Sequence, residues 1–139
     1  MKPKISPAEY RTILEALELS TLFVIELNSK LKENTASDRL SFKIDESNTF
    51  VQENNLLKII YSYKFSAKDD SKDEATITIN VKYTVVYTLT KEVIVTKDFM
   101  TVFSDLTLGM LLWPYFRELI TNTIYRMGYP QLVLPLRKK

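Results

Sequence analysis

The stretch Leu111 to Pro135, LLWPYFRELITNTIYRMGYPQLVLP, decides the fold because it encodes one long helix and the signals that end it. Pro114 suits a first helical turn, where its fixed φ is already helical and its missing N–H is not needed. Gly128, with Pro130 two residues later, is typical of a helix end. The pattern predicts a helix over 112–127 that buries one stripe against another layer. The stripe consists of Phe116, Leu119, Ile120, Thr123, Ile124 and Met127.

That other layer is predicted by four segments that alternate apolar and polar residues with the period of two typical of strands. The segment 75–95 alternates most clearly, since Ile79 and Val81 face one way while Thr78 and Asn80 face the other. The four segments span about 17–32, 40–51, 56–66 and 75–95. We expect an antiparallel sheet with one dry face turned to the long helix. That face would carry Phe23, Ile25, Ile59, Tyr61, Ile79, Val81 and Tyr83.

The first half of the chain also contains a predicted helix before the first strand and an uncertain end of the second strand. Ser6 and Pro7 are typical of a helix start, and the apolar spacing after them predicts a helix over 7–17. Phe50 and Val51 fit two interpretations, because they could continue the second strand or belong to a loop.

A second helix is expected directly after the sheet. Asp98 is a candidate cap for a helix over 98–106, and Leu106–Trp113 would link it to the long helix, with Gly109 as a hinge. The chain has 139 residues and 45% apolar content, enough for one core. We therefore expect a single α+β domain over 1–139, with a four-stranded antiparallel sheet and a two-helix layer on one face.

Composition excludes several classes of function. The sequence has no histidine and no cysteine, which removes the usual zinc ligands and the usual Cys or His nucleophiles. It has two glycines, too few for a phosphate-binding loop. The acidic run 69–74 lacks the spacing of a calcium loop and is interpreted as a solvated turn. We find no candidate catalytic or metal site, and we expect a protein that is not an enzyme and has no cofactor.

Charge and hydropathy limit the location and the partners. The net charge is +2, and no basic patch with interleaved aromatic residues suggests nucleic-acid binding. No segment reads as a signal peptide or approaches the span of a membrane helix. We expect a cytoplasmic protein that does not insert into a membrane.

An excess of apolar side chains around the expected connector is the feature that suggests a function. A two-helix layer on one sheet leaves more apolar side chains than its core readily covers, so part of them should face a ligand or another subunit. Methionine adds adaptable apolar surface to this set. We assign polypeptide binding to Phe103, Leu106, Leu108, Met110, Leu111, Leu112 and Trp113.

The strand over 17–32 has no proline or glycine to protect it as an edge, and the apolar tail 132–135 should pack on the body. We assign the oligomer interface to Leu19, Phe23, Ile25, Phe99 and Val102.

Two motifs in the last thirty or so residues resemble the SecB family of export chaperones. The run 113–118, WPYFRE, is similar to the family's aromatic-Pro-Tyr-x-Arg-Glu signature. The run 126–132, RMGYPQL, is similar to its Arg-x-Gly-aromatic-Pro-x-Leu signature. Pro114, Tyr115, Arg117 and Glu118 would then form a helix-start motif that positions the long helix.

The resemblance implies a function and an assembly. Members of the family form tetramers, built as dimers of dimers, whose apolar grooves hold unfolded polypeptides without ATP. Known members are acidic and carry a C-terminal extension, whereas this chain has a pI of about 8.7 and stops at Lys139. These departures argue against contact with the Sec translocase ATPase. They keep open a dedicated client, such as the antitoxin of a toxin–antitoxin pair.

Two hypotheses from different classes remain. One is a polypeptide-binding chaperone, or holdase, for protein export or for a dedicated client. The other is an oligomeric structural or adaptor protein whose apolar surface is fully used in self-association. The two differ in whether the native oligomer still binds an unfolded chain.

Overall fold

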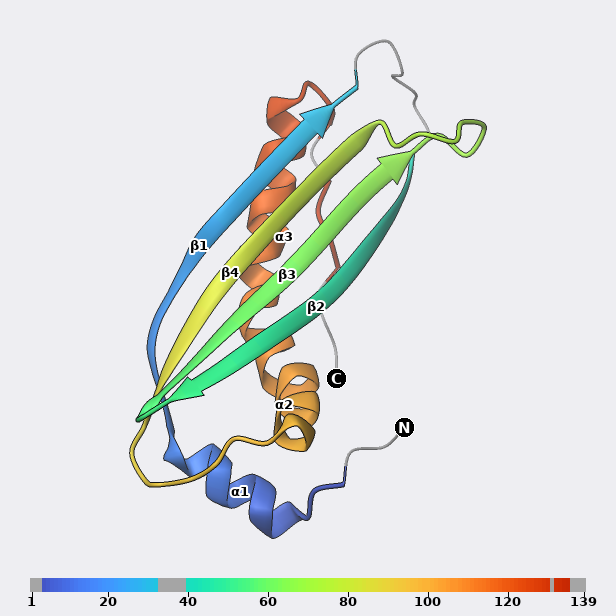
Figure 1. Ribbon diagram of the computed structural model, residues 1–139. Coiled ribbons are helices and arrows are strands. Elements are labelled where there is room, and N and C mark those ends of the chain that lie inside the picture. The colour runs from blue at the N-terminus through green and yellow to red at the C-terminus, as the bar shows by residue number, and fades with distance from the viewer. Residues whose placement is uncertain (1–3, 33–39, 131, 136–139) are drawn as a thin grey trace.

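The structure, a computed structural model, describes residues 4–32, 40–130 and 132–135, and it forms an antiparallel sheet with helices on one face (Figure 1). Residues 33–39, which separate the first two predicted strands, lie outside the described residues. The strands run in the order β1-β4-β3-β2, so β1 and β2 are the two edges. The elements are α1 (Pro7–Ala16), β1 (Leu17–Leu31), β2 (Ser41–Glu53), β3 (Leu56–Lys68), β4 (Ile77–Leu89), α2 (Lys97–Phe103), a π-helical turn η1 (Ser104–Leu108) and α3 (Gly109–Arg126).

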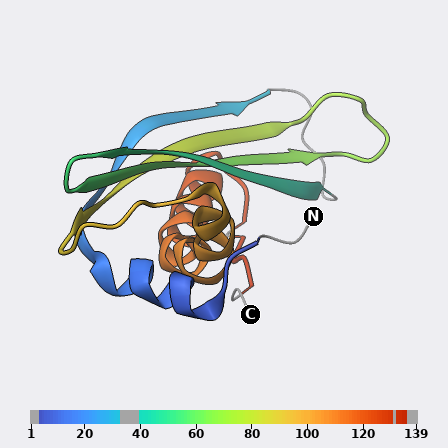
Figure 2. The ribbon, with the colours of Figure 1, turned by 60° about the horizontal axis from the view of Figure 1, so that its bottom comes forward.

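The predicted fold class is confirmed. Figure 2 shows α2 and α3 under one face of the sheet, with α1 at one end of the molecule. The Tyr63 ring of β3 stacks on the Phe116 ring of α3, with centroids 4.1 Å apart, and this contact joins the two layers. The first helix begins as its sequence predicts, because Ser6 Oγ accepts a hydrogen bond from the Glu9 amide at 3.1 Å and Pro7 occupies the first turn.

The helical layer differs from the prediction in its middle. Residues 97–126 form one continuous helical run, so the expected connector Leu106–Trp113 is itself helical. Pro114 is the sixth residue of α3 rather than part of its first turn, which corrects the helix-start motif. Proline has no amide hydrogen, so the carbonyl four residues before it receives no helical hydrogen bond. The Pro114 ring is exposed, so this carbonyl lies on the solvent side of the helix. The sequence suggested breaks here because Gly109 and Pro114 usually mark helix ends, but burial of the apolar stripe outweighs that preference.

Both ends of the helical run are set by local hydrogen bonds. Thr96, not Asp98, is the cap of α2, since its Oγ1 accepts from the Phe99 amide at 3.1 Å. The predicted stop at the other end is confirmed. Gly128 has φ +88°, a left-handed conformation that favours glycine, and its amide donates to the Tyr125 carbonyl at 3.1 Å.

The register of β3 and β4 agrees with the prediction, whereas that of β1 does not. The side chains of Ile59, Tyr61, Ile79, Val81 and Tyr83 are all buried under the helices. In β1, irregularities between Leu19 and Thr21 and between Val24 and Glu26 each shift the register. Phe23 therefore pairs with Thr84 on the outer face of the sheet, and the prediction that it faces the long helix is wrong.

The second strand is the longer of the two alternatives that the sequence left open. Phe50 and Val51 both lie within β2, so the strand continues past them. Gln52, near its end, fixes the segment that leads from the sheet to α2. Its Nε2 donates to the Val93 carbonyl at 2.7 Å, and its Oε1 accepts from the Val95 amide at 2.7 Å. One side chain thus ties the start of the helical layer to an edge strand.

The continuous helical run also corrects the expectation about membrane-length segments. The 30 residues Lys97–Arg126 are long and apolar enough, by length and composition only, to cross a membrane. Their buried stripe packs on the sheet, as in the core helix of many globular proteins, so the composition is explained by this packing.

Two tyrosines in the core make the stability of the fold depend on alkaline pH. Burial raises the pKa of Tyr83 to about 12, with a smaller effect of the Glu118 charge, and burial raises the pKa of Tyr87 to about 12. In the unfolded chain these phenols titrate near pH 10, so between pH 10 and 12 the unfolded state binds fewer protons than the folded state. We expect the free energy of unfolding to fall across that interval.

Urea unfolding measured at pH 8, 10 and 11 checks this expectation. The matched variant Tyr87→Phe removes one of the two phenols and should lose less stability between pH 10 and 11 than the unaltered chain. Equal losses in the two proteins would mean that the Tyr87 phenol does not contribute.

Candidate functional site

The structure divides the seven residues assigned to polypeptide binding into two groups. Phe103, Leu108 and Leu112 are at most 1% exposed and belong to the core, so they are not available to a client in this fold. Leu106 and Met110 are 51% and 41% exposed. Leu111 and Trp113 are half-buried. The expectation that the whole connector forms a binding surface is therefore corrected, because as a helix it must turn one side toward the sheet.

The accessible residues form a stripe along one side of the helical run. Leu106, Met110 and Trp113 are spaced by four and then three residues, which places them on the same helical face. We call these three residues the open stripe. The indole of Trp113 lies near the core, with its ring centroid 5.7 Å from that of Phe116. The open stripe therefore begins at the core edge and runs toward α2 as exposed apolar surface.

The same face continues into a polar section that is already occupied. Residues 132–135, which we call the strap, lie beside α3 in both ribbon views (Figures 1 and 2). The prediction that this tail packs on the body is confirmed. Three side chains of α3 donate hydrogen bonds to strap carbonyls. These bonds are Thr121 Oγ1 to Leu132 (2.7 Å), Arg117 Nε to Leu134 (2.7 Å) and Trp113 Nε1 to Pro135 (2.8 Å).

The strap explains what part of the expected helix-start motif does. Arg117 holds the strap, while Glu118 accepts a hydrogen bond from Asn122 and Tyr115 is 51% exposed. Thr121 was missed as a functional residue, and a hydroxyl four residues after Arg117 was the signal that could have found it. Beside the strap lies a shallow hollow of 350 Å³. Its lining is Pro114, Arg117, Glu118, Thr121, Asn122 and Val133.

The residues assigned to the oligomer interface also divide. Leu19, Phe23 and Ile25 are 45–47% exposed along the edge strand β1. Phe99 is fully buried in the core and Val102 is half-buried, so Phe99 cannot contact another subunit in this fold. Three further exposed β1 residues were not assigned to the interface. They are Val24, Leu27 and Leu31, and all three pair with β4 residues that are buried on the helix-facing side of the sheet.

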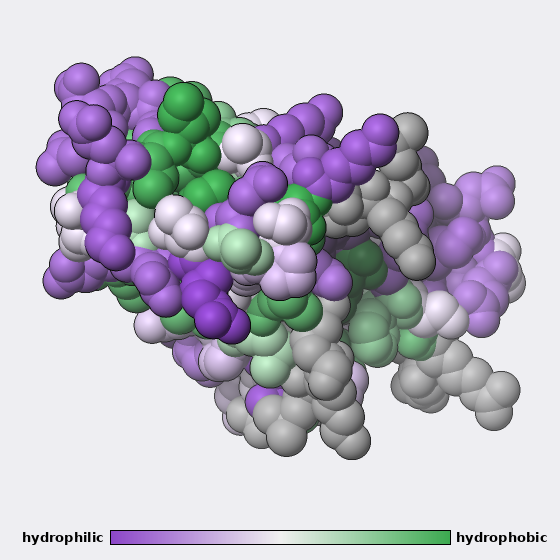
Figure 3. Space-filling model, turned by 90° about the horizontal axis from the view of Figure 1, so that it is seen from below, coloured by the Kyte–Doolittle hydropathy of each residue, from purple (hydrophilic) through white to green (hydrophobic). Residues whose placement is uncertain are grey.

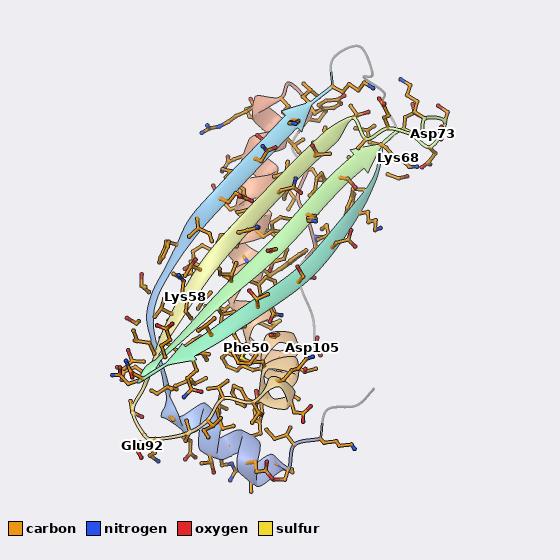
Figure 4. All side chains as sticks on the ribbon, viewed as in Figure 1. Phe50, Lys58, Lys68, Asp73, Glu92 and Asp105 are labelled. Carbon is orange, nitrogen blue, oxygen red and sulfur yellow. The ribbon has the colours of Figure 1, made fainter. Side chains whose placement is uncertain are left out.

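The surface shows where apolar and charged groups gather. Figure 3 looks onto the end that carries α1 and shows apolar patches separated by polar side chains. Figure 4 places Lys68 and Asp73 at the opposite end of the sheet, far from α2. Among the described residues, no group of three or more acidic, histidine or cysteine side chains is arranged to hold a metal ion. The acidic run 69–74 thus lies at the end of the sheet away from α2 and does not contribute to the open stripe.

The fold resembles that of a known chaperone. The Mycobacterium tuberculosis Rv1957 SecB-like chaperone, solved in complex with a ChAD peptide from the Rv1956 HigA1 antitoxin, aligns with a TM-score of 0.78. The alignment covers 95% of this chain and 98% of that chain, at 12% sequence identity. The fold is SecB-like. This similarity confirms the resemblance predicted from the two motifs at the level of the fold.

Other comparisons add little to this similarity. A protein of unknown function from Streptococcus agalactiae aligns with a TM-score of 0.46 and 12% identity, over 87% of this chain and 99% of that chain, which is too low to support a conclusion. No family model and no curated protein matches the sequence.

Proposed function

We propose that this protein is a chaperone that binds non-native polypeptide segments and holds them without ATP. The observation that carries the proposal is the open stripe, where Leu106 and Met110 expose apolar surface on a helix of a SecB-like fold. Exposed apolar surface next to a half-buried aromatic residue is the kind of site that binds varied apolar segments. The solved SecB-like neighbour holds a peptide, which supports the same class of ligand.

The proposed client is an unfolded or partly folded polypeptide in the cytoplasm. The peptide in the neighbour comes from an antitoxin, which favours a dedicated client of that kind over general export through the Sec translocase ATPase. Apolar contact contributes about 25 cal/mol per Å² covered, so one short stripe gives only weak binding. Several stripes on one oligomer, proposed to be a tetramer, would raise the overall affinity for a long unfolded chain.

Replacing both Leu106 and Met110 with aspartate tests this proposal. Both side chains are at least 41% exposed, so the double variant is expected to fold and to keep its oligomeric state. Two carboxylates on the open stripe would have to be desolvated against a client, so suppression of client aggregation should fall at least tenfold. Light scattering of a reduced, unfolded client during dilution from denaturant gives the measurement.

The matched control is Ile94→Asp, which alters a 79% exposed residue on the loop before α2 and should leave the suppression unchanged. A folded double variant that suppresses aggregation as well as the control does would remove the open stripe from client binding.

The exposed β1 edge favours the second candidate, an oligomeric adaptor that uses its apolar surface for self-association. An apolar fluorescent dye separates the two functions. A chaperone should bind the dye and an unfolded client as the native oligomer, and the adaptor should bind neither.

A further inference from the structure

The strap and α3 fit each other through their spacing. Four residues of helix rise about 6 Å, and two residues of extended chain span about 6.6 Å. The carbonyls of Leu132 and Leu134 are two residues apart and bond to Thr121 and Arg117, which are four residues apart. The indole of Trp113 reaches the next carbonyl, that of Pro135. Donors repeated along one helical face can therefore hold an extended chain that runs opposite to the helix.

The bonds in this arrangement do not depend on the side chains of the strap. All three donors contact backbone carbonyls, which every polypeptide has. Side chains contribute by alternation, since Leu134 is 1% exposed in the core while its neighbour Val133 is 64% exposed. The face of α3 would accept any extended segment that places an apolar residue where Leu134 lies.

We propose that the donor face of α3, formed by Trp113, Arg117 and Thr121, is a binding slot for an extended client segment with apolar residues at alternate positions. The strap occupies the slot until a client segment displaces it. This inference rests on the proposed chaperone function and deepens it, because it names the conformation and the pattern of the bound segment. The occupant seen in the structure, the chain's own strap, supplies that pattern.

The position of the slot relates it to the open stripe. Trp113 belongs to both, so a client bound along Leu106 and Met110 reaches the slot at its Trp113 end. A tethered strap has an effective concentration that is roughly millimolar, so a client that uses the slot alone competes poorly. A client that also covers the open stripe gains the affinity needed to displace the strap.

A dye on the strap tests displacement in the full chain. The sequence has no cysteine, so Val133→Cys creates a single labelling position on an outward-facing side chain. The ligand is a synthetic peptide that repeats residues 129–135, YPQLVLP. Adding this peptide at roughly 10 mM, above the roughly millimolar effective concentration of the tethered strap, should lower the fluorescence anisotropy of the dye as the strap leaves α3. The matched control, Lys58→Cys on the outer face of the sheet (Figure 4), should show no change.

Two further variants connect the signal to the slot. Leu134→Ala removes the buried side chain of the strap and should raise the affinity of a fluorescent copy of the same peptide about tenfold, because the slot is free in a larger fraction of molecules. Adding Arg117→Met and Thr121→Val, which keep side-chain bulk but remove both donors, should reverse that gain.

Several results would overturn the inference. They are a bound peptide that leaves the Val133 label unchanged, an equal affinity with and without Leu134→Ala, and no peptide binding to any variant. None of them decides the proposed function, which depends on whether the unaltered chain suppresses aggregation of an unfolded client. If the unaltered chain does not suppress aggregation of the client, the proposed chaperone function is wrong, whatever the peptide experiments show.

Discussion

Replacing Leu112 with aspartate is expected to unfold the protein at 25 °C. Leu112 is fully buried between α3 and the sheet. Truncating a buried leucine to alanine already costs about 2–5 kcal/mol, and an unpaired buried carboxylate adds several more. Together they approach the whole free energy of unfolding of a typical domain, roughly 5–15 kcal/mol. Far-UV circular dichroism should show loss of structure or, at the least, a large drop in the urea midpoint.

Leu106→Asp is the matched control, since it lies on the same helical run and is 51% exposed. It should change the free energy of unfolding by less than about 1 kcal/mol. The contrast corrects the expectation from the sequence that Leu108 and Leu112 belong to an accessible surface that binds a client. A stably folded Leu112→Asp variant would show that this side of α3 does not face the sheet.

Lysine at two positions of the β1 edge is expected to reduce the protein to monomers. Phe23 and Ile25 are exposed on a long edge strand that, within the described residues, has a neighbour on only one side. Such an edge readily pairs with another chain, and charged residues along it oppose that pairing. The unaltered chain should therefore be oligomeric at micromolar concentration, most simply a tetramer, and Phe23→Lys with Ile25→Lys should be monomeric. Multi-angle light scattering gives both masses.

Val51→Lys provides the control at the other edge of the sheet. Val51 lies on β2 and is 54% exposed, so it matches the exposure of the β1 residues without altering that strand. Its mass should equal that of the unaltered chain. A monomeric mass for the unaltered chain would contradict self-association through β1 and remove the multivalent part of the proposed function.

The parts of the fold that could be predicted are those where one physical pattern acts alone. Apolar and polar residues alternate along β4 with a single break at Val86, so its face toward the helices followed from the sequence. The start of α1 and the end of α3 depend on local hydrogen bonds around Ser6 and Gly128, and both were predictable for that reason. In these places nearby residues decide the structure without distant contacts.

The parts that could not be predicted depend on contacts between distant residues. The irregularities in β1 occur at Ser20 and Ile25. Neither residue is a glycine or proline, and nothing in the sequence around them indicates a bulge. Gly109 and Pro114 usually interrupt helices, yet here the sheet buries the apolar residues on both sides of them. For the same reason the apolar excess was recognised while its division into core and surface was not. Composition counts apolar residues, and only the packed layers show which of them remain accessible.

The π-helical turn at Ser104–Leu108 is the place where the helical run should tolerate the deletion of one residue. From the last residue of the turn onward the buried residues follow a four-residue step, at Leu108, Leu112 and Phe116, whereas Phe103 and Leu108 are five residues apart. A π turn contains one residue more than a regular turn, and this extra residue keeps both halves facing the sheet. Deletion of the exposed Asp105 inside the turn would restore the ordinary four-residue step between Phe103 and Leu108 and should keep both of them facing the sheet. A one-residue deletion farther along α3 would rotate all that follows by about 100°, which would carry Thr121 away from the strap.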